Sequence, residues 1–321
     1  MTLDPQIIPI DCEYVYPQVA CAYLVIAGQG RDRSAAFVEN NTSHAVPGLL
    51  QALEQNDLRP EQVRYAMITH VHLDHAGGTS ALLQACPNAV CVAHPKAARH
   101  VINPERLIQS SRAVYGDEMF TKLYGRIDPV DESRVRVMQD NETLDMGPRK
   151  FHFFFTRGHA DHHFCILEEQ SEVIFTGDSF GIGYPRLQTG KRPFLFPSTT
   201  PTQFDADEAR KSVHIIRNSG ARVAGLTHFG PFFDMKVGAE QLLSGLDQME
   251  ELLERAVDSD LSGDALQSFC EDGVRDFFRA EMEDRGMSLT EDEWKLVEID
   301  AGINAMGLAY AAERIRKKTG S

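Results

Sequence analysis

Residues 69–78 read Thr69-His70-Val71-His72-Leu73-Asp74-His75-Ala76-Gly77-Gly78, and no other stretch says as much about the fold. Four side chains that can bind a metal ion lie within six residues. An apolar run typical of a buried strand precedes them at Val63–Ile68, and a helix is expected after them at Ser80–Cys86. Because side chains two residues apart converge more readily on extended or looped backbone than on a helix, we expect a loop at the strand end. Gly77 and Gly78 are expected to supply a sharp turn and a close backbone approach.

The overall composition is that of a globular protein. The chain has 321 residues, of which 42% are hydrophobic and 25% charged, enough for one large domain with an appendage or two modest domains. No leader-like segment and no apolar run of membrane-spanning length is evident, so we expect a cytoplasmic protein with no membrane partner. Six scattered cysteines without Cys-x-x-Cys spacing predict free, mostly buried thiols: Cys12, Cys21, Cys86, Cys91, Cys165 and Cys270.

The negative charge is concentrated near the C-terminus. Of the net charge of −15, residues 240–300 contribute −14, from 19 acidic and 5 basic residues. Phosphate binding needs clustered Lys and Arg, so nucleic acid is not an expected partner. Solvated helix faces account for this acidity.

Strands and helices alternate through the first half of the chain, which predicts a layered α/β domain. Strands are expected at 18–27, 34–39, 63–68 and 88–93, and helices at 46–55, 80–86 and 96–101. A helical stretch at 105–124 interrupts this order. Strands are then expected at 135–138, 143–145, 151–156, 163–167 and 173–176, followed by a long loop at 180–204, a helix at 206–218 and a strand at 222–226.

From about residue 236 the pattern is helical, with helices expected at 238–258, 264–285 and 290–318. Thr290 with Glu293 forms a capping-box signature at the start of the last one. This helix also carries small residues that predict close helix packing, with a homodimer contact through the C-terminal helices as a further expectation: Ala301, Gly302, Ala305, Gly307, Ala309, Ala311 and Ala312. We therefore divide the chain into a catalytic domain, 1–235, and a helical C-terminal extension, 236–321.

Three further motifs follow expected strands: Gly158-His159-Ala160-Asp161-His162-His163, Phe175-Thr176-Gly177-Asp178-Ser179 and Thr227-His228-Phe229. Alone, each is a weak signal. Together with residues 69–78, they make the chain resemble the metallo-β-lactamase superfamily over roughly residues 15–235. The resemblance implies an α/β fold, a four-layer αββα sandwich, here with a helical C-terminal cap.

The resemblance also implies two divalent metal ions and seven ligands. The first metal would be held by His70, His72 and His159, the second by Asp74, His75 and His228, with Asp178 bridging them. Imidazoles and carboxylates suit borderline divalent metals, so zinc is the first choice and iron or manganese are alternatives. Two such ions can share a hydroxide, lower its pKa towards neutrality and present it as a nucleophile. Asp74 is also the candidate catalytic residue, which would orient the hydroxide or accept a proton.

The remaining histidines near these motifs have plainer roles. His162 and His163 flank His159 and are expected to belong to a strand or to support the ligands. His94, at a strand end, is expected to cap a helix or face solvent.

Three departures from the family pattern bear on specificity. Many members have an Asp-Thr-Gly-like turn where this chain has Glu39-Asn40-Asn41, and Glu39 is the residue that would take over its supporting role. The branch that hydrolyses glutathione thioesters has a Gly-Cys-Gly-Arg run where this chain has Phe180-Gly181-Ile182-Gly183, which argues against glutathione recognition. In the lactonase branch a tyrosine closely follows the bridging Asp, whereas here Tyr184 lies six residues on.

We predict a hydrolase of a small ester, thioester or lactone, with a small-molecule substrate. The helical stretch at 104–125 and the C-terminal helices can form an apolar lid over the cleft, although core packing explains the same aromatics. The basic loop 184–192 can contact an anionic substrate or serve only as a surface loop.

Alternatives remain open at this point. They are a phosphodiester or phosphotriester hydrolase, a metal-binding regulatory protein with vestigial hydrolysis, and an oxygen-dependent enzyme with one iron.

Overall fold

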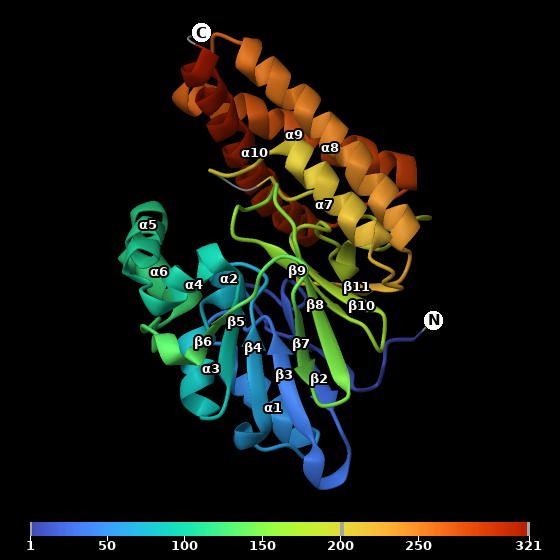
Figure 1. Ribbon diagram of the computed structural model, residues 1–321. Helices are drawn as coiled ribbons and strands as arrows, with labels where there is room; N and C mark the ends of the chain where they lie inside the picture. Colours follow the sequence, from blue (N-terminus) through green and yellow to red (C-terminus); the bar gives the residue numbers. More distant parts are fainter. Residues whose placement is uncertain (1, 200–201, 320–321) are drawn as a thin grey trace. The chain divides into compact units, whose positions relative to one another are not determined.

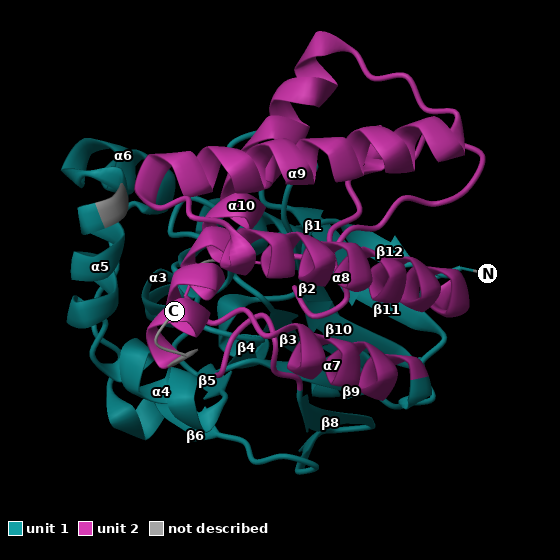
Figure 2. Ribbon diagram, turned by 90° about the horizontal axis from the view of Figure 1, so that it is seen from above, with its two compact units in different colours: residues 1–155, 162–177, 218–233 teal, residues 156–161, 178–217, 234–321 magenta. Residues whose placement is uncertain are grey.

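The computed structural model describes residues 2–199 and 202–319. Contacts divide the chain into two compact units, drawn in teal and magenta in Figure 2. Unit 1 comprises Met1–Phe155, His162–Gly177 and Asn218–Phe233, and unit 2 comprises Thr156–Asp161, Asp178–Arg217 and Asp234–Ser321. The domain division at residue 235 stays a prediction. Residues 1 and 320–321 of those predicted domains, and residues 200–201 of the predicted long loop, lie outside the described residues.

The first sheet of unit 1 has six strands in sequential order (Figure 1). They are β1 (Ile7–Asp11), β2 (Cys21–Ala27), β3 (Ser34–Val38), β4 (Val63–Met67), β5 (Val90–Ala93) and β6 (Val135–Val137). β1, β2 and β3 pair antiparallel, whereas β3 to β6 pair parallel. Because parallel neighbours end at the same edge of a sheet, Glu39 after β3 and Thr69 after β4 lie side by side.

The second sheet of unit 1 also has six strands, in the order β12-β11-β10-β9-β8-β7. They are β7 (Thr143–Met146), β8 (Arg149–Phe155), β9 (Phe164–Glu168), β10 (Val173–Gly177), β11 (Val223–Leu226) and β12 (Gly230–Phe232). β10 and β11 pair parallel, and the other neighbours pair antiparallel. The loops after β10 and β11 therefore start from one edge of this sheet.

Successive side chains of β2 point alternately into two hydrophobic cores, one on each face of the first sheet. Tyr23 and Val25 point into a core shared with Phe153 and Phe175 of the second sheet, so the two sheets pack face to face. Leu24 and its alternate neighbours face the opposite core, which contains apolar residues of the helices. Sheet 1 is thus covered on both faces, which explains why β2 is buried along its whole length.

The helices of unit 1 are α1 (Val46–Gln55), α2 (Leu73–Ala76), α3 (Thr79–Ala85), α4 (Pro95–Ile102), α5 (Glu105–Tyr115) and α6 (Asp117–Tyr124). The prediction of one helical stretch at 105–124 is wrong at Gly116. This glycine has φ +76 and lies between α5 and α6, a conformation that breaks a helix. Phe120 and Tyr124 of α6 are buried against Leu73, so core packing accounts for these two aromatics.

Unit 2 holds most of α7 (Ala206–Asn218) and three long helices, α8 (Met235–Asp258), α9 (Gly263–Arg285) and α10 (Glu291–Thr319), which pack against one another. The capping box is confirmed: the backbone N–H of Thr290 donates to Glu293 Oε2 at 2.7 Å, and the Glu293 N–H donates to Thr290 Oγ1 at 3.4 Å. Close packing of small residues is confirmed where α10 buries Ala301, Ala305 and Ala312 completely.

The structure confirms the α/β class and the helical C-terminal region. Two strands, β1 and β12, were not predicted. β1 contains Pro9 and, within the described part of the chain, pairs with β2 alone, and β12 is three residues long with Pro231 at its centre, so both lack the usual strand signal. The six cysteines, all among the described residues, form no disulfide, as predicted. Among residues 2–199 and 202–319, no helix combines the length and apolarity that crossing a membrane requires.

Candidate metal centre

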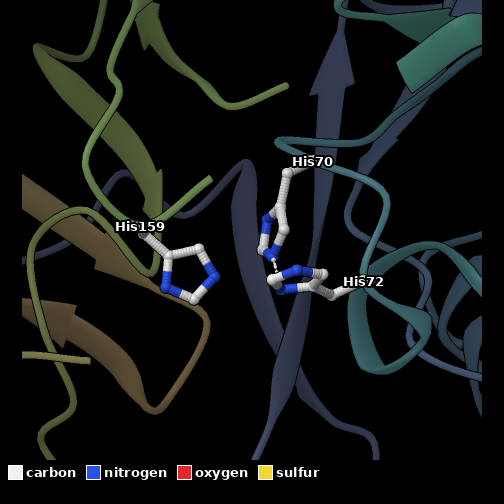
Figure 3. Close-up of side chains that lie close together, drawn as sticks. All are labelled: His70, His72 and His159. Carbon is white, nitrogen blue, oxygen red and sulfur yellow. Dashed lines mark hydrogen bonds between the residues drawn. The ribbon is translucent and has the colours of Figure 1, made fainter. Parts of the chain in front are cut away.

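The segment after β4 is partly extended and partly helical. His70 lies in a bend after β4, and His72, on extended backbone (φ −61, ψ 148), is the N-cap of α2. Their ring nitrogens converge, because His70 Nε2 lies 2.9 Å from His72 Nδ1, as the dashed line in Figure 3 shows. The expectation of a loop is wrong for Asp74 and His75, which lie in the single turn of α2. This turn nevertheless brings Asp74 Oδ2 to 3.7 Å from His75 Nε2.

Gly77 and Gly78 are needed for space rather than for a turn. The expected turn is confirmed, because residues 77 and 78 form the turn between α2 and α3, but both have φ in the right-handed helical region (−63 and −82), which any residue can adopt. The close approach is confirmed: a Cβ on Gly78 would lie 2.6 Å from the carbonyl oxygen of Asn40, and one on Gly77 would lie 2.5 Å from that of Leu73. Larger residues would push the motif away from the loop that carries Glu39.

His228 approaches the same carboxylate from the end of β11. Its Nδ1 lies 2.8 Å from the carbonyl oxygen of Val19, and its Nε2 lies 3.3 Å from Asp74 Oδ2. One ligand atom each from Asp74, His75 and His228 lies within 4.8 Å of the others. Unit 1 therefore brings these three predicted ligands together, from two loops more than 150 residues apart in sequence.

Glu39 is the buried carboxylate behind this cluster. It is 1% exposed and accepts hydrogen bonds from the Thr69 hydroxyl, the Thr69 backbone N–H (3.3 Å) and the Thr227 hydroxyl (3.3 Å). His75 Nδ1 lies 3.1 Å from the same carboxylate. The Thr69 oxygen in turn lies 3.1 Å from His70 Nδ1. A single carboxylate thus orients His75 directly and His70 through Thr69.

These contacts fix which nitrogen of each ring is protonated. In His75, His228 and His70, Nδ1 faces a carboxylate, a carbonyl oxygen and a hydroxyl oxygen, respectively. Nδ1 therefore carries the hydrogen of the neutral ring, and Nε2 presents a lone pair. Histidines that bind metal ions are typically held in this way, with the other ring nitrogen donating to a carboxylate or carbonyl. The donor set of unit 1 thus fits a divalent cation.

The neighbouring histidines surround the cluster. His163 is fully buried and stacks on the His70 ring at 4.8 Å. Burial, followed by the proximity of other histidines, lowers the pKa of His162 to about 3. His94 accepts from the backbone N–H of Lys96 at 3.0 Å, so the capping interpretation is confirmed.

Unit 2 contains the other two predicted ligands. His159, which Figure 3 also labels, has its Nε2 3.4 Å from Asp178 Oδ2. Gly158 before it has φ +111, and a Cβ there would lie 2.2 Å from the backbone nitrogen of Ala209. Within unit 2, a cavity of about 20 Å³ is lined by Arg157, His159, Asp178, Ser179, Gly181, Pro197, Ser198, Ala209, Val213, Leu242 and Leu246.

The loop after Asp178 is tied to the long helices of its own unit. The Tyr184 hydroxyl is buried and donates to Asp300 of α10 at 3.3 Å. Thr199 is anchored to Asn304, and the Gln241 side chain donates to the carbonyl oxygen of Pro193. In the basic part of this loop, Arg192 pairs with Asp284. Most of this loop is therefore ordered by specific contacts.

The sequence also contains a signal for the hydrogen bonds around Glu39. A threonine precedes a candidate histidine twice, at Thr69-His70 and Thr227-His228. Both threonine hydroxyls donate to Glu39. The repeated Thr-His pair thus indicates two loops whose threonines donate hydrogen bonds to one carboxylate. The contribution of the Val19 carbonyl has no such signal, because a backbone oxygen is the same in every residue.

Comparison with known proteins agrees with this fold and donor set. The family model of the metallo-beta-lactamase superfamily matches residues 34–228, more than half of the chain. The chain therefore belongs to the metallo-beta-lactamase superfamily, whose members typically bind divalent metal ions, and is a hydrolase of that superfamily. The predicted fold is confirmed with it.

The relatives include one fold-level match and two enzymes with assigned reactions. Metallo-beta-lactamase fold-containing protein ST1585 of Sulfurisphaera tokodaii is 27% identical over 238 residues, which are 73% of this chain and 82% of that protein. The crystal structure of ST1585 matches with a TM-score of 0.60 at 22% identity, covering 86% of this chain and 96% of that one.

The other two relatives match over a shorter region. An atrochrysone carboxyl ACP thioesterase of Aspergillus chevalieri is 28% identical over 49% of this chain and 39% of its own length. A hydroxyacylglutathione hydrolase of Francisella tularensis subsp. novicida is 25% identical over 46% of this chain and 47% of its own. This chain thus spans less than half the length of either enzyme.

Proposed function

We propose that the protein is a dinuclear metal-dependent hydrolase of a small ester, thioester or lactone. The arrangement that carries the proposal is the cluster of Asp74, His75 and His228 backed by Glu39, because it combines metal-binding donors with fixed tautomers. In this proposal, His70, His72 and His159 would hold one metal, Asp74, His75 and His228 would hold the other, and Asp178 would be a ligand shared by both. Zinc is the metal we favour, with iron or manganese as alternatives.

Each side chain then has a defined task. Two divalent ions, when bound, supply a water molecule acidified enough to attack at neutral pH and polarise the carbonyl oxygen of the substrate. Asp74 Oδ2, held beside His228 Nε2, orients the attacking water and accepts its proton. Glu39 keeps the Nε2 lone pairs of His70 and His75 directed at the centre. His163 and the apolar surroundings exclude bulk water from the His70 side.

The substrate class rests on two kinds of support. One relative is a thioesterase by name and another hydrolyses hydroxyacylglutathione, so carbonyl substrates are represented among the matches. The walls of the small cavity beside His159 and Asp178 carry one cationic side chain, Arg157, among mainly uncharged ones, which offers little to a polyanion. Chemistry at a carbonyl is therefore favoured over chemistry at a phosphate.

A substrate panel tests the proposal. Purified protein with its metal content measured would be assayed on aryl esters, thioesters, lactones and phosphoesters, beside Asp178→Asn and Asp74→Asn variants. We expect turnover of at least one carbonyl substrate and its loss in both variants. Two bound metals without activity on any carbonyl substrate would refute the proposal, and turnover restricted to phosphoesters would assign the enzyme to phosphoester hydrolysis. One iron per chain with oxygen-dependent turnover would also contradict it.

A further inference from the structure

Helix α10 carries a second apolar face that its own unit leaves exposed. Ile299, Ile303, Met306 and Tyr310 are 44%, 37%, 41% and 47% exposed, whereas Ala301, Ala305, Leu308 and Ala312 on the other side of the helix are buried. The exposed residues follow one another in steps of four, three and four, so they form one line along the helix. We call these four residues the α10 stripe. A helix that is apolar on two faces usually has a partner on each.

Charged residues extend the α10 stripe at both ends with the same spacing. Asp292 and Lys295 precede it, and their side chains pair at 2.8 Å. Glu313 and Lys317 follow it, and their side chains pair at 3.6 Å. Steps of three or four residues connect all eight positions from 292 to 317 on one face.

The order of side chains on this face is complementary to its own reverse. When a second α10 is laid antiparallel with the two-fold axis between Ile303 and Met306, Ile303 lies opposite the partner's Met306 and Ile299 opposite the partner's Tyr310. Asp292 then lies opposite the partner's Lys317, because residues 292 and 317 are equally distant in sequence from the axis, as 299 and 310 are. Lys295 lies within one residue of the position opposite the partner's Glu313. Every apolar residue thus meets an apolar one, and every charge meets its opposite.

We propose that the α10 stripe is a homodimer interface in which two copies of this chain pair their α10 helices antiparallel about a two-fold axis. A two-fold interface must be complementary to itself, and this face meets that condition in both polarity and charge. An unrelated partner would not require the pattern to be symmetric about its own centre. The small residues of α10, which the sequence offered for a dimer contact, are mostly buried within unit 2. We therefore place the dimer contact on the α10 stripe instead. The proposal does not depend on the enzymatic activity.

Solution mass and charge reversal test the interface. We expect sedimentation equilibrium of the full chain to give a dimer, and Ile303→Glu to give a monomer. Asp292→Lys and Lys317→Asp should each raise the dimer dissociation constant about tenfold, because each places two like-charge pairs in the dimer. The double variant should return to within about threefold of the wild type, because the reversed charges pair again. Lys236→Asp is the matched control, since Lys236 also pairs with a glutamate four residues on, but from α8.

Cross-linking tests the register and covers the case in which a variant fails to fold. Ile303→Cys and Met306→Cys proteins, mixed and mildly oxidised, should form a mixed disulfide dimer faster than either alone, with melting temperature confirming that each is folded. A monomer at all concentrations would overturn the proposal, as would a dimer that Ile303→Glu leaves intact. A dimer in which Asp292→Lys with Lys317→Asp is no tighter than the single variants would overturn the antiparallel register.

Discussion

The two units hold their candidate ligands in different ways. In unit 1, the loops after β4 and β11 are fastened to Glu39 through Thr69 and Thr227, and the imidazoles of His75 and His228 each have a fixed hydrogen-bond partner. In unit 2, His159 and Asp178 contact each other at 3.4 Å and line a small cavity whose walls are partly polar and partly apolar. The carboxylate that contacts the imidazoles is 1% exposed in unit 1, where it is Glu39, and 7% exposed in unit 2, where it is the candidate ligand Asp178.

Substituting a candidate ligand can lower metal binding, folding free energy or both, and the two units should differ in the second. In unit 1, removing an imidazole also strips a donor from a buried carboxylate, which costs folding free energy. In unit 2, the His159 side chain is also buried, at 3% exposed, but its partner Asp178 is 7% exposed, against 1% for Glu39, so the loss of His159 should cost less folding free energy. Metal content should therefore fall after substitution in either unit, and stability should fall more in unit 1 than in unit 2.

The largest expected effect is the loss of one imidazole from either unit. We expect His75→Ala and His159→Ala each to lower kcat/KM by about 10³, because each removes a proposed ligand. Metal analysis should show reduced content in both. In the metal-free state, His75→Ala should lower the melting temperature more than His159→Ala, since it takes a contact from Glu39, which is more deeply buried than Asp178.

An exposed histidine on α7, replaced as His214→Ala, serves as the control and should change neither quantity. Equal loss of metal-free stability in both variants would contradict the contrast between the units. Full metal content in His159→Ala would show that this residue does not hold a metal.

The next effect concerns the buried arginine that each unit contains. Arg149 is 1% exposed and pairs at 2.9 Å with Glu168, which is fully buried, while it also donates to the Ile26 carbonyl. Arg285 is 3% exposed, but its partner Glu281 is 22% exposed. Arg149→Met should lower the free energy of unfolding by about 3–5 kcal/mol, because it leaves a buried charge unpaired.

Arg285→Met should cost about 1–2 kcal/mol, since water can reach Glu281 once the arginine is gone. Urea unfolding combined with hydrogen exchange resolved by unit measures both, and the exposed Arg222→Met is the control. A larger loss for Arg285→Met than for Arg149→Met would reverse the expected ranking.

A smaller effect is expected from Glu39→Gln, which keeps the shape of the side chain and removes its charge. Substitutions of groups that orient metal ligands typically weaken metal binding 10- to 100-fold, and we expect a loss in that range. Competition with a chromophoric chelator measures it without reference to activity. The exposed Glu13→Gln is the control. An unchanged affinity would show that Glu39 supports the fold of the loops but not the tautomers of His70 and His75.

The sequence predicts correctly those helices whose bounds are determined by residues within and next to the helix. Helix α1 and helix α7 begin and end where the pattern predicts, because their apolar periodicity and flanking residues are contained in the segments themselves. The break at Gly116 and the helical turn at Asp74–His75 were missed. The first depends on one backbone conformation and the second on a four-residue helix, and both are below the length at which periodicity is informative.

For the candidate centre, the sequence predicted the candidate ligands but not the groups that hydrogen-bond to them. The cluster of Asp74, His75 and His228 could be proposed because the motifs are specific. The carbonyl of Val19 and the convergence of two threonines on Glu39 depend on which strands are neighbours, which single residues do not encode. The position of the α10 stripe likewise required knowing which face of the helix unit 2 buries.

The smallest effect expected distinguishes the units by their thiols. Burial raises the pKa of Cys91 in unit 1 from its ordinary value of 9.0 to about 12, and that of Cys270 in unit 2 to about 11. A raised pKa means that the folded state keeps the thiol neutral while the unfolded state ionises. The stability from each neutral thiol is therefore fully present below pH 9 and is lost as the pH rises towards the folded value.

Between pH 8 and 9.5, each such thiol should remove about 0.8 kcal/mol from the free energy of unfolding. Cys21 and Cys86 of unit 1 also have raised pKa values, of about 12 and about 11, so unit 1 should lose more protection from hydrogen exchange than unit 2 over this range. Cys91→Ala should lessen the pH dependence of unit 1, and Cys270→Ala that of unit 2. The same variants at pH 7 provide the baseline, because their cavity cost does not depend on pH, whereas the thiol contribution does. Equal pH dependence in Cys91→Ala and the wild type would mean that the Cys91 thiol reaches solvent in the folded state, and that the packing around this side chain is looser than its 0% exposure indicates.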